Sequence, residues 1–281
     1  MSMNKITSRQ IADFRKNLIE EEKAGATLEK YVRDVVTFST WLGNRVLSKE
    51  TVLAYKEFLT ERYAPASVNS ILSSLNSFFA FTFRHELKVK TLKIQRRIFA
   101  GDEKELSKAE YERLLTAAKA KGNQKLYLLM QTICATGIRV SELRYITVES
   151  LHAQKAQINL KGKMRIVILP AALCAMLLRY IKTQNITSGS VFISKKGKPL
   201  DRSNIWKLMK ALCESANVPR EKVFPHNLRH LFARTFYALQ KDIVRLADIL
   251  GHSSVNTTRI YTMETGEVHR MQIQKLGLLQ C

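Results

Sequence analysis

The sequence predicts a mainly α-helical protein with two domains, the second of which contains a small antiparallel β-sheet. Its 281 residues exceed the roughly 250 residues at which single hydrophobic cores stop growing. Apolar residues recur at helical spacing through most of the chain. The alternation typical of strands is clear in only one stretch, residues 156–169, which has a turn in its middle.

The chain carries a large excess of basic residues. Lysine and arginine total 46 against 24 acidic residues, a net charge of +22. A hydrophobic fraction of 46% nevertheless predicts a globular protein with a real core. Such an excess of positive charge favours a polyanionic partner, and nucleic acid first of all. A generic basic surface is the alternative interpretation.

Other classes of protein are disfavoured by what the sequence lacks. No apolar run approaches the roughly 20 residues of a membrane-spanning helix, and no signal peptide opens the chain, so no membrane partner is expected. The cysteines are scattered without a C-x-x-C pair, which fits a reducing cytoplasm and argues against a zinc site. They are Cys134, Cys174, Cys213 and Cys281.

Residues 1–87 are predicted to form a four-helix domain. Thr7 and Gln10 have the spacing of a capping box at the first helix start, and Gly43 fits the end of the second helix. Ser48 and Pro65 mark the starts of the third and fourth helices. The apolar stripes are Ile11, Phe14 and Leu18; Leu28, Tyr31, Val35, Phe38 and Leu42; Val52, Tyr55, Phe58 and Leu59; and Val68, Ile71, Leu72, Leu75, Phe78 and Phe79.

Residues 88–101 are predicted to form a basic linker. Its first ten residues contain no acidic side chain. A charge run of this kind is usually a solvated linker, and between two candidate DNA-facing domains it can also follow a phosphate backbone. Both interpretations are kept for its basic residues, which are Lys88, Lys90, Lys93, Arg96 and Arg97.

Residues 102–281 are predicted to form the second, mostly α-helical domain. A capping box of Ser107 and Glu110 opens its first helix, an apolar helix covers 126–134 and stops before Gly137, and another helix begins near Val140. Strands are expected at 156–160 and 165–169 around the turn 161–163, with a third short strand at 191–193. Helices are expected again from Ser203 onward.

The C-terminal stretch concentrates side chains that suit phosphodiester chemistry. His226 and Arg229 share one face of a helix that begins at Pro225, while His252 follows the helix stop at Gly251. Tyr261 is expected about two turns into a helix capped by Ser254. Guanidinium groups, histidines and a tyrosine can together hold and attack a phosphodiester without a metal.

Each of these residues also has a simpler role. The spacing of His226 and His230 occurs in metal sites, but the charge of Arg229 between them opposes a bound cation. A surface helix with incidental basic residues, and a tyrosine used only in packing, are the alternatives for this stretch. Arg139, near a helix start, could simply pair with Glu142. Lys161, at the hairpin tip, could be an ordinary exposed lysine or could carry an ammonium group into a groove.

Three sequence boxes resemble the signatures of the tyrosine recombinase (phage integrase) family. They read A-T-G-I-R-V-S-E-L, H-N-L-R-H and L-G-H-S-S-V-N-T-T-R-I-Y, and they stand in the family's order and at similar separations. The run P-A-S-V-N-S-I-L-S-S-L-N-S-F-F looks like the family's core-binding domain. The resemblance covers nearly the whole chain and is strongest to the short, Xer-like site-specific recombinases.

The resemblance implies a role for each catalytic position. Tyr261 would be the nucleophile, and Arg139 and Arg229 would clamp the scissile phosphate. His226 would assist proton transfer, and His252 would donate a hydrogen bond to the phosphate. The general acid on the leaving 5′-oxygen would be Lys161 of the hairpin, with Lys163 as the alternative and as a DNA-binding residue. His230 is expected to be structural or to support the site from behind. Neither a metal nor ATP is expected.

The resemblance also implies an assembly on DNA. Two domains would form a C-shaped clamp around an inverted-repeat core site, and four protomers would hold two duplex sites and exchange strands through a Holliday junction. Accessory or directionality proteins, a cytoplasmic location and service to a mobile element fit the same picture. The tail, with Val268, Met271, Leu276 and Leu279 at roughly helical spacing, is expected to dock on a neighbouring protomer. A type IB topoisomerase and a non-catalytic DNA-binding regulator are the competing hypotheses.

Overall fold

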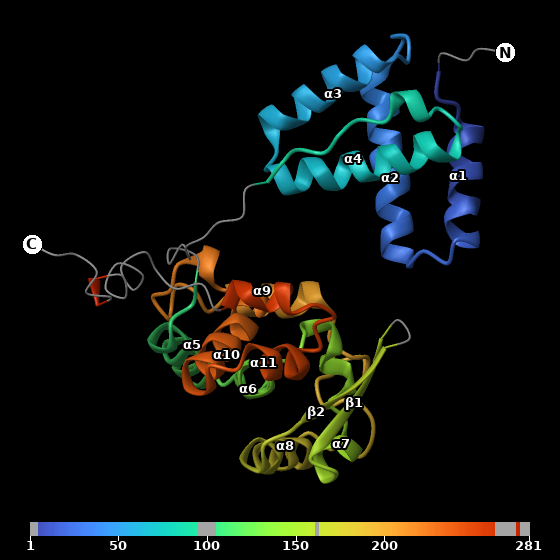
Figure 1. The fold of residues 1–281 in the computed structure, drawn as a ribbon. Helices are drawn as coiled ribbons and strands as arrows, with labels where there is room; N and C mark the ends of the chain where they lie inside the picture. Colours follow the sequence, from blue (N-terminus) through green and yellow to red (C-terminus); the bar gives the residue numbers. More distant parts are fainter. Residues whose placement is uncertain (1–4, 95–104, 161–162, 262–273, 276–281) are drawn as a thin grey trace, which may run out of the picture. The chain divides into compact units, whose positions relative to one another are not determined.

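The protein consists of two compact units. The computed structural model describes residues 5–94, 105–160, 163–261 and 274–275, with the side chains of residues 160 and 163 left out. The first unit is Met1–Arg96 and the second is Arg97–Cys281, so the change of unit falls inside the stretch predicted as a linker. Each unit is mainly helical, and the second contains one antiparallel pair of strands (Figure 1). The predicted mainly α fold with a small antiparallel sheet is therefore confirmed.

The first unit is a bundle of α-helices that begin and end where local sequence signals place them. Thr7 and Ser48 cap their helices through side-chain hydrogen bonds, and Gly43 ends the second helix with a positive φ of 57°. Pro65 occupies the first position of the fourth helix. The elements are α1 (Ser8–Glu20), α2 (Gly25–Leu42), α3 (Lys49–Arg62), α4 (Pro65–Phe81) and the 3-10 helix η1 (His85–Leu87).

The core of the first unit is rich in aromatic rings. Phe38 on α2 lies 4.9 Å from Tyr55 on α3 and 6.1 Å from Phe79 on α4, measured between ring centroids. The chain then runs along α4, because Asn76 and Asn69 each bond a peptide group beyond η1. The Asn76 amide donates to the Val89 carbonyl and accepts from its N–H, and Asn69 does the same with Leu92. The described residues of the predicted linker therefore belong to the first unit.

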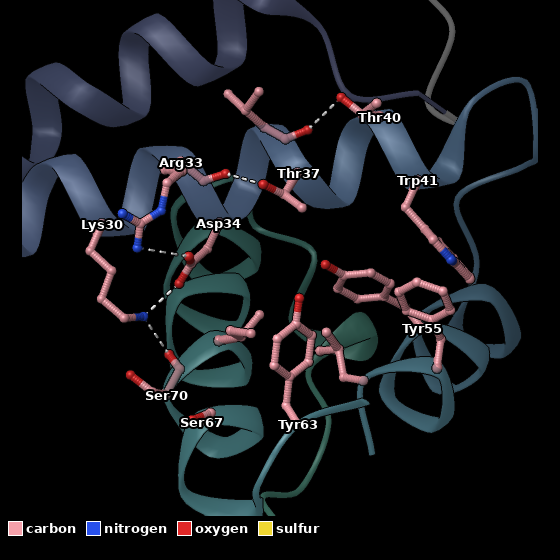
Figure 2. A pocket seen from close by; sticks show the side chains of 14 residues that line it. Lys30, Arg33, Asp34, Thr37, Thr40, Trp41, Tyr55, Tyr63, Ser67 and Ser70 are labelled. Atoms are coloured by element: carbon pink, nitrogen blue, oxygen red, sulfur yellow. Dashed lines mark hydrogen bonds and ion pairs between the residues drawn. The ribbon is translucent and has the colours of Figure 1, made fainter. Parts of the chain in front are cut away.

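A hollow of about 760 Å³ opens in the first unit between α2, α3 and α4. Figure 2 shows Lys30 and Arg33 reaching the carboxylate of Asp34 at its wall. Lys30 also donates to the carbonyl of Ser70 and contacts the hydroxyl of Ser74, which itself donates to Asp34. The buried Asp34 carboxylate is thus satisfied by several partners, and the network joins α2 to α4.

The second unit contains the remaining elements. Its helices are α5 (Lys108–Ala120), α6 (Gln124–Thr136), α7 (Val148–His152), α8 (Ala171–Thr183), α9 (Arg202–Lys210), α10 (Pro225–Gln240), α11 (Ile243–Leu250) and α12 (Val255–Thr258). Its 3-10 helices are η3 (Val140–Tyr145), η4 (Arg220–Lys222) and η5 (Arg259–Tyr261), and its strands are β1 (Lys155–Leu160) and β2 (Lys163–Ile168). The predicted capping box of Ser107 and Glu110 opens α5.

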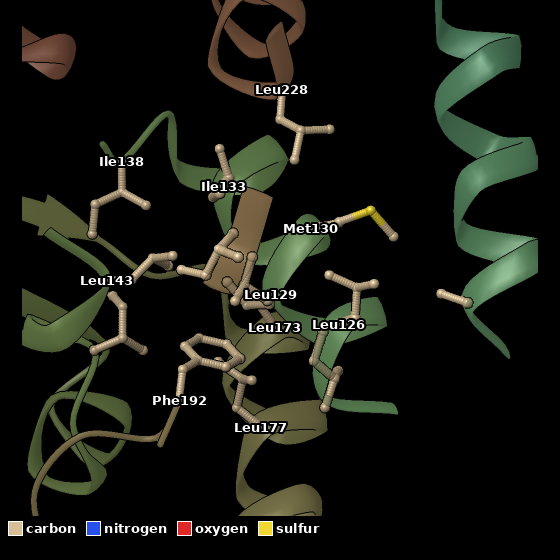
Figure 3. Packing of buried hydrophobic residues seen from close by; sticks show 14 of the residues in the cluster. Leu126, Leu129, Met130, Ile133, Ile138, Leu143, Leu173, Leu177, Phe192 and Leu228 are labelled. Carbon is tan, nitrogen blue, oxygen red and sulfur yellow. The ribbon is translucent and has the colours of Figure 1, made fainter. Parts of the chain in front are cut away.

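Helix α6 is the central element of the second unit. It contacts α5, α8, α9 and α10, and Figure 3 shows Leu129 and Ile133 packed among Leu173 of α8, Phe192 and Leu228 of α10. A helix buried on so many sides is held firmly in position and direction. Gly137, which ends α6 at a φ of 63°, therefore lies at a fixed point, and the chain that follows it starts from there.

The hairpin pairs β1 with β2 in an antiparallel register from Lys155–Ile168 to Leu160–Lys163. β2 begins at Lys163, two residues earlier than the sequence predicted. The prediction of a third strand at 191–193 is wrong, because the described residues there form only an isolated bridge between Ile193 and Pro199. Among the described residues, the structure contains no helix long and apolar enough to cross a membrane.

Candidate active site

Arg229 lies at the centre of the candidate site. It projects from the second turn of α10 and is 1% exposed. Its guanidinium donates to the carbonyl of Gly137 and, at 2.8 Å, to the carbonyl of Leu250, and it lies 3.0 Å from Nε2 of His252. Burial and the neighbouring Arg139 lower the pKa of Arg229 to about 10, which still leaves it charged at neutral pH.

His252 is held in one tautomer by its two neighbours. Its Nδ1 lies 2.8 Å from the hydroxyl of the buried Thr258. Because a guanidinium can only donate, Nε2 facing Arg229 must accept, and the ring proton is assigned to Nδ1. Burial, Arg229 and other nearby arginines lower the pKa of His252 to about 4, so the ring is neutral at pH 7.

Tyr261 is packed inside the unit, with only 5% of its surface exposed. It forms a small apolar cluster with Ala233, Leu246 and Leu250, and its ring stacks at 19° to His252 with 6.1 Å between centroids. The prediction that Tyr261 lies about two turns into one α-helix is wrong. Ser254 caps its helix as expected, but α12 has only four residues and Tyr261 ends the 3-10 turn η5.

Two histidines on one face of α10 extend from the protein surface to Tyr261. His226 is exposed, and its ring centroid lies 4.4 Å from that of His230. The ring of His230 in turn meets Tyr261 edge to face at 4.9 Å. Burial is the main cause that lowers the pKa of both histidines, that of His230 to about 4. Of these two histidines, the one whose ring meets Tyr261 is therefore His230, which the sequence placed outside the catalytic set.

Arg139 combines the two roles that the sequence left open. Its Nη1 donates to Oε1 of Glu142 at 3.0 Å, and its Nη2 donates to the carbonyl of Gly251 at 3.3 Å. The side chain is still 39% exposed, whereas that of Glu142 is 2% exposed. An ion pair with Glu142 thus anchors Arg139 next to His252 and leaves part of its guanidinium open to solvent.

Three further residues support this site, and two of them, Arg165 and Thr258, did not stand out in the sequence. The hydroxyl of Thr258 pairs with Nδ1 of His252. The carboxylate of Glu142 accepts hydrogen bonds from both the side chain and the backbone N–H of Arg139. Arg165 on β2 donates to Glu142 at 2.5 Å and to the carbonyl of Ile249 at 2.6 Å. Glu142 carried a sequence signal in its helical spacing from Arg139. The contacts of Arg165 and Thr258 depend on tertiary packing, and no local pattern marks them.

The remaining predicted site residues belong to the hairpin turn and the linker. Lys161 lies outside the described residues, and so does the side chain of Lys163, whose backbone begins β2. Arg96, Arg97 and the tail residues Val268, Met271, Leu276 and Leu279 also lie outside them. Lys88, Lys90 and Lys93 belong to the first unit, where Lys90 and Lys93 are exposed and Lys88 is half-buried.

Comparison with known families shows the family to which the chain belongs. Residues 104–267 match the model of the phage integrase family, and residues 11–86 match that of the phage integrase N-terminal SAM-like domain. The chain belongs to the phage integrase family. The tyrosine recombinase XerD of Lacticaseibacillus casei is 30% identical over 90% of this chain and 92% of its own. The tyrosine recombinase XerA of Pyrococcus furiosus is 27% identical over 90% of this chain and 97% of its own.

Solved structures of family members share the fold. A lambda integrase dimer bound to a core site superposes with a TM-score of 0.74 at 18% identity, covering 92% of this chain and 96% of that one. At this identity the likeness concerns the fold. The membership predicted from the three sequence boxes is confirmed by the family match and by the XerD and XerA relatives.

Proposed function

We propose that this protein is a site-specific DNA recombinase, which cuts and rejoins duplex DNA through a 3′-phosphotyrosyl intermediate. Membership of a family that includes the XerD and XerA tyrosine recombinases supports this function. The observation that carries it is the convergence of Arg139 with Arg229, His252 and Tyr261 of the C-terminal stretch around the C-terminal end of α11. Neither a relaxing topoisomerase nor a binding-only regulator receives comparable support.

In the proposed reaction, Arg139 and Arg229 bind the scissile phosphate. The hydroxyl oxygen of Tyr261 attacks phosphorus, a bond forms between them, and the bond from phosphorus to the 5′-oxygen breaks. Negative charge grows on the phosphoryl oxygens during this step, and two guanidinium groups stabilise it where other enzymes use a metal. The lowered pKa of Arg229 remains well above neutrality, so its charge is available.

Proton transfer completes the proposed reaction. The proton of Tyr261 passes to a neutral histidine, for which His226 is our assignment from the H-N-L-R-H box. Partial desolvation and nearby positive charges lower the pKa of His226, so its ring is neutral at pH 7. Lys161 protonates the leaving 5′-oxygen, with Lys163 as the alternative. Nε2 of His252 accepts from Arg229 in the structure, so it carries no proton to donate. We therefore expect Arg229 to turn toward a bound phosphate and the ring proton of His252 to move from Nδ1 to Nε2, which can then donate to the phosphate.

The assembly on DNA is also proposed. Residues 1–87 form the core-binding domain, 88–101 the basic linker and 102–281 the catalytic domain, and together they close as a C-shaped clamp around an inverted-repeat core site. The basic side chains of the linker and Lys163 contact the DNA backbone. The net charge of +22 supports DNA binding of this kind. Four protomers act on two sites in the cytoplasm, with room for accessory or directionality proteins, and the DNA element served is a phage, a transposon, an invertible promoter or a chromosome dimer.

The experiment that tests the function is capture of the covalent adduct. Wild-type protein, Tyr261→Phe and Tyr237→Phe are incubated with fragmented genomic DNA of the source cell, stopped with detergent, and the DNA that stays attached to protein is sequenced. Tyr237→Phe is the matched control, because Tyr237 packs against the same apolar cluster as Tyr261. Both variants lose one phenolic hydroxyl, so they differ only in which tyrosine is changed.

We expect adducts from wild type and Tyr237→Phe, clustered at an inverted repeat, and none from Tyr261→Phe. Adducts that persist in Tyr261→Phe would overturn the assignment of the nucleophile. Adducts spread without sequence preference would overturn site-specific recombination in favour of a relaxing activity. If wild type binds DNA but forms no adduct, the result would favour the hypothesis of a non-catalytic DNA-binding regulator.

A further inference from the structure

The C-terminal end of α11 is surrounded by three arginines. The carbonyl of Ile249 accepts from Arg165 at 2.6 Å, that of Leu250 from Arg229 at 2.8 Å, and that of Gly251 from Arg139 at 3.3 Å. Carbonyl groups at a helix C-terminus carry partial negative charge and attract cations. Two of these arginines are the proposed phosphate clamp, while the third, Arg165, has no role in the proposed chemical steps.

Arg165 faces the interior because of its place on β2. Its strand neighbours Met164 and Ile166 are 65% and 60% exposed, so alternation directs Arg165 to the opposite, inner face. Its side chain is 15% exposed. Each terminal nitrogen of Arg165 donates one hydrogen bond, Nη1 to the carbonyl of Ile249 and Nη2 to Oε2 of Glu142, and Nε is buried without a partner among the described residues. Because the side chain is largely buried and its bonds go to other residues of the site, Arg165 is placed to act through Ile249 and Glu142.

Glu142 divides its carboxylate between two arginines. Oε1 accepts from Arg139, and Oε2 accepts from Arg165 and from the N–H of Arg139. Burial alone would raise the pKa of Glu142, but that N–H and the charge of Arg165 hold it below its usual value. The three side chains together carry one net positive charge. Without Arg165 the remaining pair would be neutral, and the charge that Arg139 offers to a phosphate would be largely cancelled.

The stem of Arg165 also supports the turn that carries His252. A Cβ at Gly251 would lie 2.9 Å from Nε of Arg165 and closer still to its Cδ, so the stem lies directly against the Gly251 backbone. Gly251 has a φ of 64°, which glycine adopts without strain. Through Arg165, strand β2 is thus attached both to Glu142, which holds Arg139, and to Gly251, which precedes His252.

We propose that Arg165 is a positioning residue of the cleavage site: it balances the charge of Glu142 and holds the end of α11, so that Arg139 and His252 meet the scissile phosphate. This inference rests on the proposed function. Arg165 makes no contact with the reacting atoms, and its effect passes through Glu142 and through the carbonyl of Ile249.

The test compares the charge-removing variant Arg165→Gln with the matched control Arg179→Gln. Arg165→Gln and Arg179→Gln each remove one positive charge from the second unit, and Arg179 is exposed on α8. Single-turnover adduct formation is measured on a nicked duplex of the site recovered by adduct capture. We expect Arg165→Gln to slow cleavage by about 10- to 100-fold, because misplacing a guanidinium by about 1 Å has effects of that order. Arg179→Gln should stay within about 3-fold of wild type, as exposed single charges do.

A second variant separates the electrostatic role from a merely structural one. In Glu142→Gln/Arg165→Gln the buried carboxylate is replaced by a neutral amide, so the charge of Arg139 is no longer cancelled. We expect this double variant to cleave at least about 5-fold faster than Arg165→Gln alone, a non-additive result typical of residues that interact directly. The urea midpoint of each variant shows whether folding is preserved.

A substrate of altered charge gives an independent reading. A methylphosphonate at the scissile position carries no charge, so its cleavage depends less on the charge of Arg139. The loss caused by Arg165→Gln should therefore shrink on this substrate, whereas a folding defect would slow both substrates equally.

The outcomes distinguish a failure of the positioning role of Arg165 from a failure of the proposed recombinase function. If wild type cleaves and Arg165→Gln cleaves as fast as Arg179→Gln, the positioning role is refuted while the recombinase function stands. Equal losses on both substrates, without rescue by the double variant, also refute it and leave a structural role. If wild type forms no adduct that depends on Tyr261, the proposed function fails and the positioning role falls with it.

Discussion

Replacing Gly137 by alanine tests whether the end of α6 sets the position of Arg229. Gly137 has a φ of 63°, and a Cβ there would lie 2.5 Å from Cδ1 of Phe232 and 3.0 Å from Cδ2 of Leu250. Its carbonyl accepts a hydrogen bond from Arg229. The change therefore adds steric overlap to an unfavourable backbone conformation, next to a residue of the proposed phosphate clamp.

The magnitude follows from two separate terms. A left-handed conformation costs an alanine about 1–2 kcal/mol relative to glycine. Overlap with Phe232 and Leu250 adds about 1–3 kcal/mol, as overpacking in a filled site does. Gly137→Ala should therefore lower the free energy of unfolding by about 2–5 kcal/mol. Gly122 also has a φ of 63°, but a Cβ added there would have nothing within 4 Å, so Gly122→Ala should lose only the first term of about 1–2 kcal/mol.

Urea denaturation of both variants measures this difference, and adduct formation measures its effect on the site. We expect Gly137→Ala to cleave at least about 10-fold more slowly than Gly122→Ala at a temperature where both are folded, because the overlap displaces the backbone carbonyl that accepts from Arg229. The double variant Gly137→Ala/Phe232→Leu should recover part of the lost stability by making room for the added carbon. Equal destabilisation by the two single variants would refute the steric argument, and equal cleavage would refute the link from Gly137 to Arg229.

Further predictions follow from the histidines and from the tail. His230 and His252 have pKa values lowered to about 4, below the ordinary value of about 6.5, so the unfolded chain binds protons first as pH falls. The free energy of unfolding should therefore drop by roughly 1–3 kcal/mol between pH 6.5 and pH 4, after allowance for solvent screening of these half-buried rings, and urea midpoints of a His230→Asn variant should depend less on pH. Nitrogen-15 spectra should show His252 protonated on Nδ1, and Thr258→Val should cost about 1–2 kcal/mol by leaving that N–H without its partner; a proton on Nε2 would contradict the assignment. Truncation at Glu267 should impair cooperative assembly on paired sites, measured by gel shift, while binding to a single site stays intact; unchanged cooperativity would show that the tail does not link protomers.

Local signals in the sequence were sufficient for most of the helices and their ends. Capping residues such as Thr7, Ser48 and Ser107 act over three or four residues, so they are readable wherever they occur, and each begins a helix in the structure. The glycines that end α6 and α11 work in the same way, through a backbone conformation that other residues avoid. Residues 191–193 were misjudged because three apolar residues carry too little periodicity to separate a strand from a buried loop.

The catalytic set was suggested by family-like boxes and not by spacing alone, because its members come from segments far apart in the chain. The hydrogen bonds that join Arg229 to Gly137 and Leu250 span 92 and 21 residues. No local pattern encodes such contacts. They form only when the apolar face of α10 packs on α6 and on α11.

The sequence by itself determined the mainly helical class, most helix boundaries, the hairpin and the family. Only the tertiary structure decided that His230 contacts Tyr261, and that Arg165 joins Arg139 and Arg229 around the end of α11. The physical reason is range: caps and periodicity act within one or two helical turns, whereas a buried charge finds its partner among groups that the core brings together from anywhere in the chain.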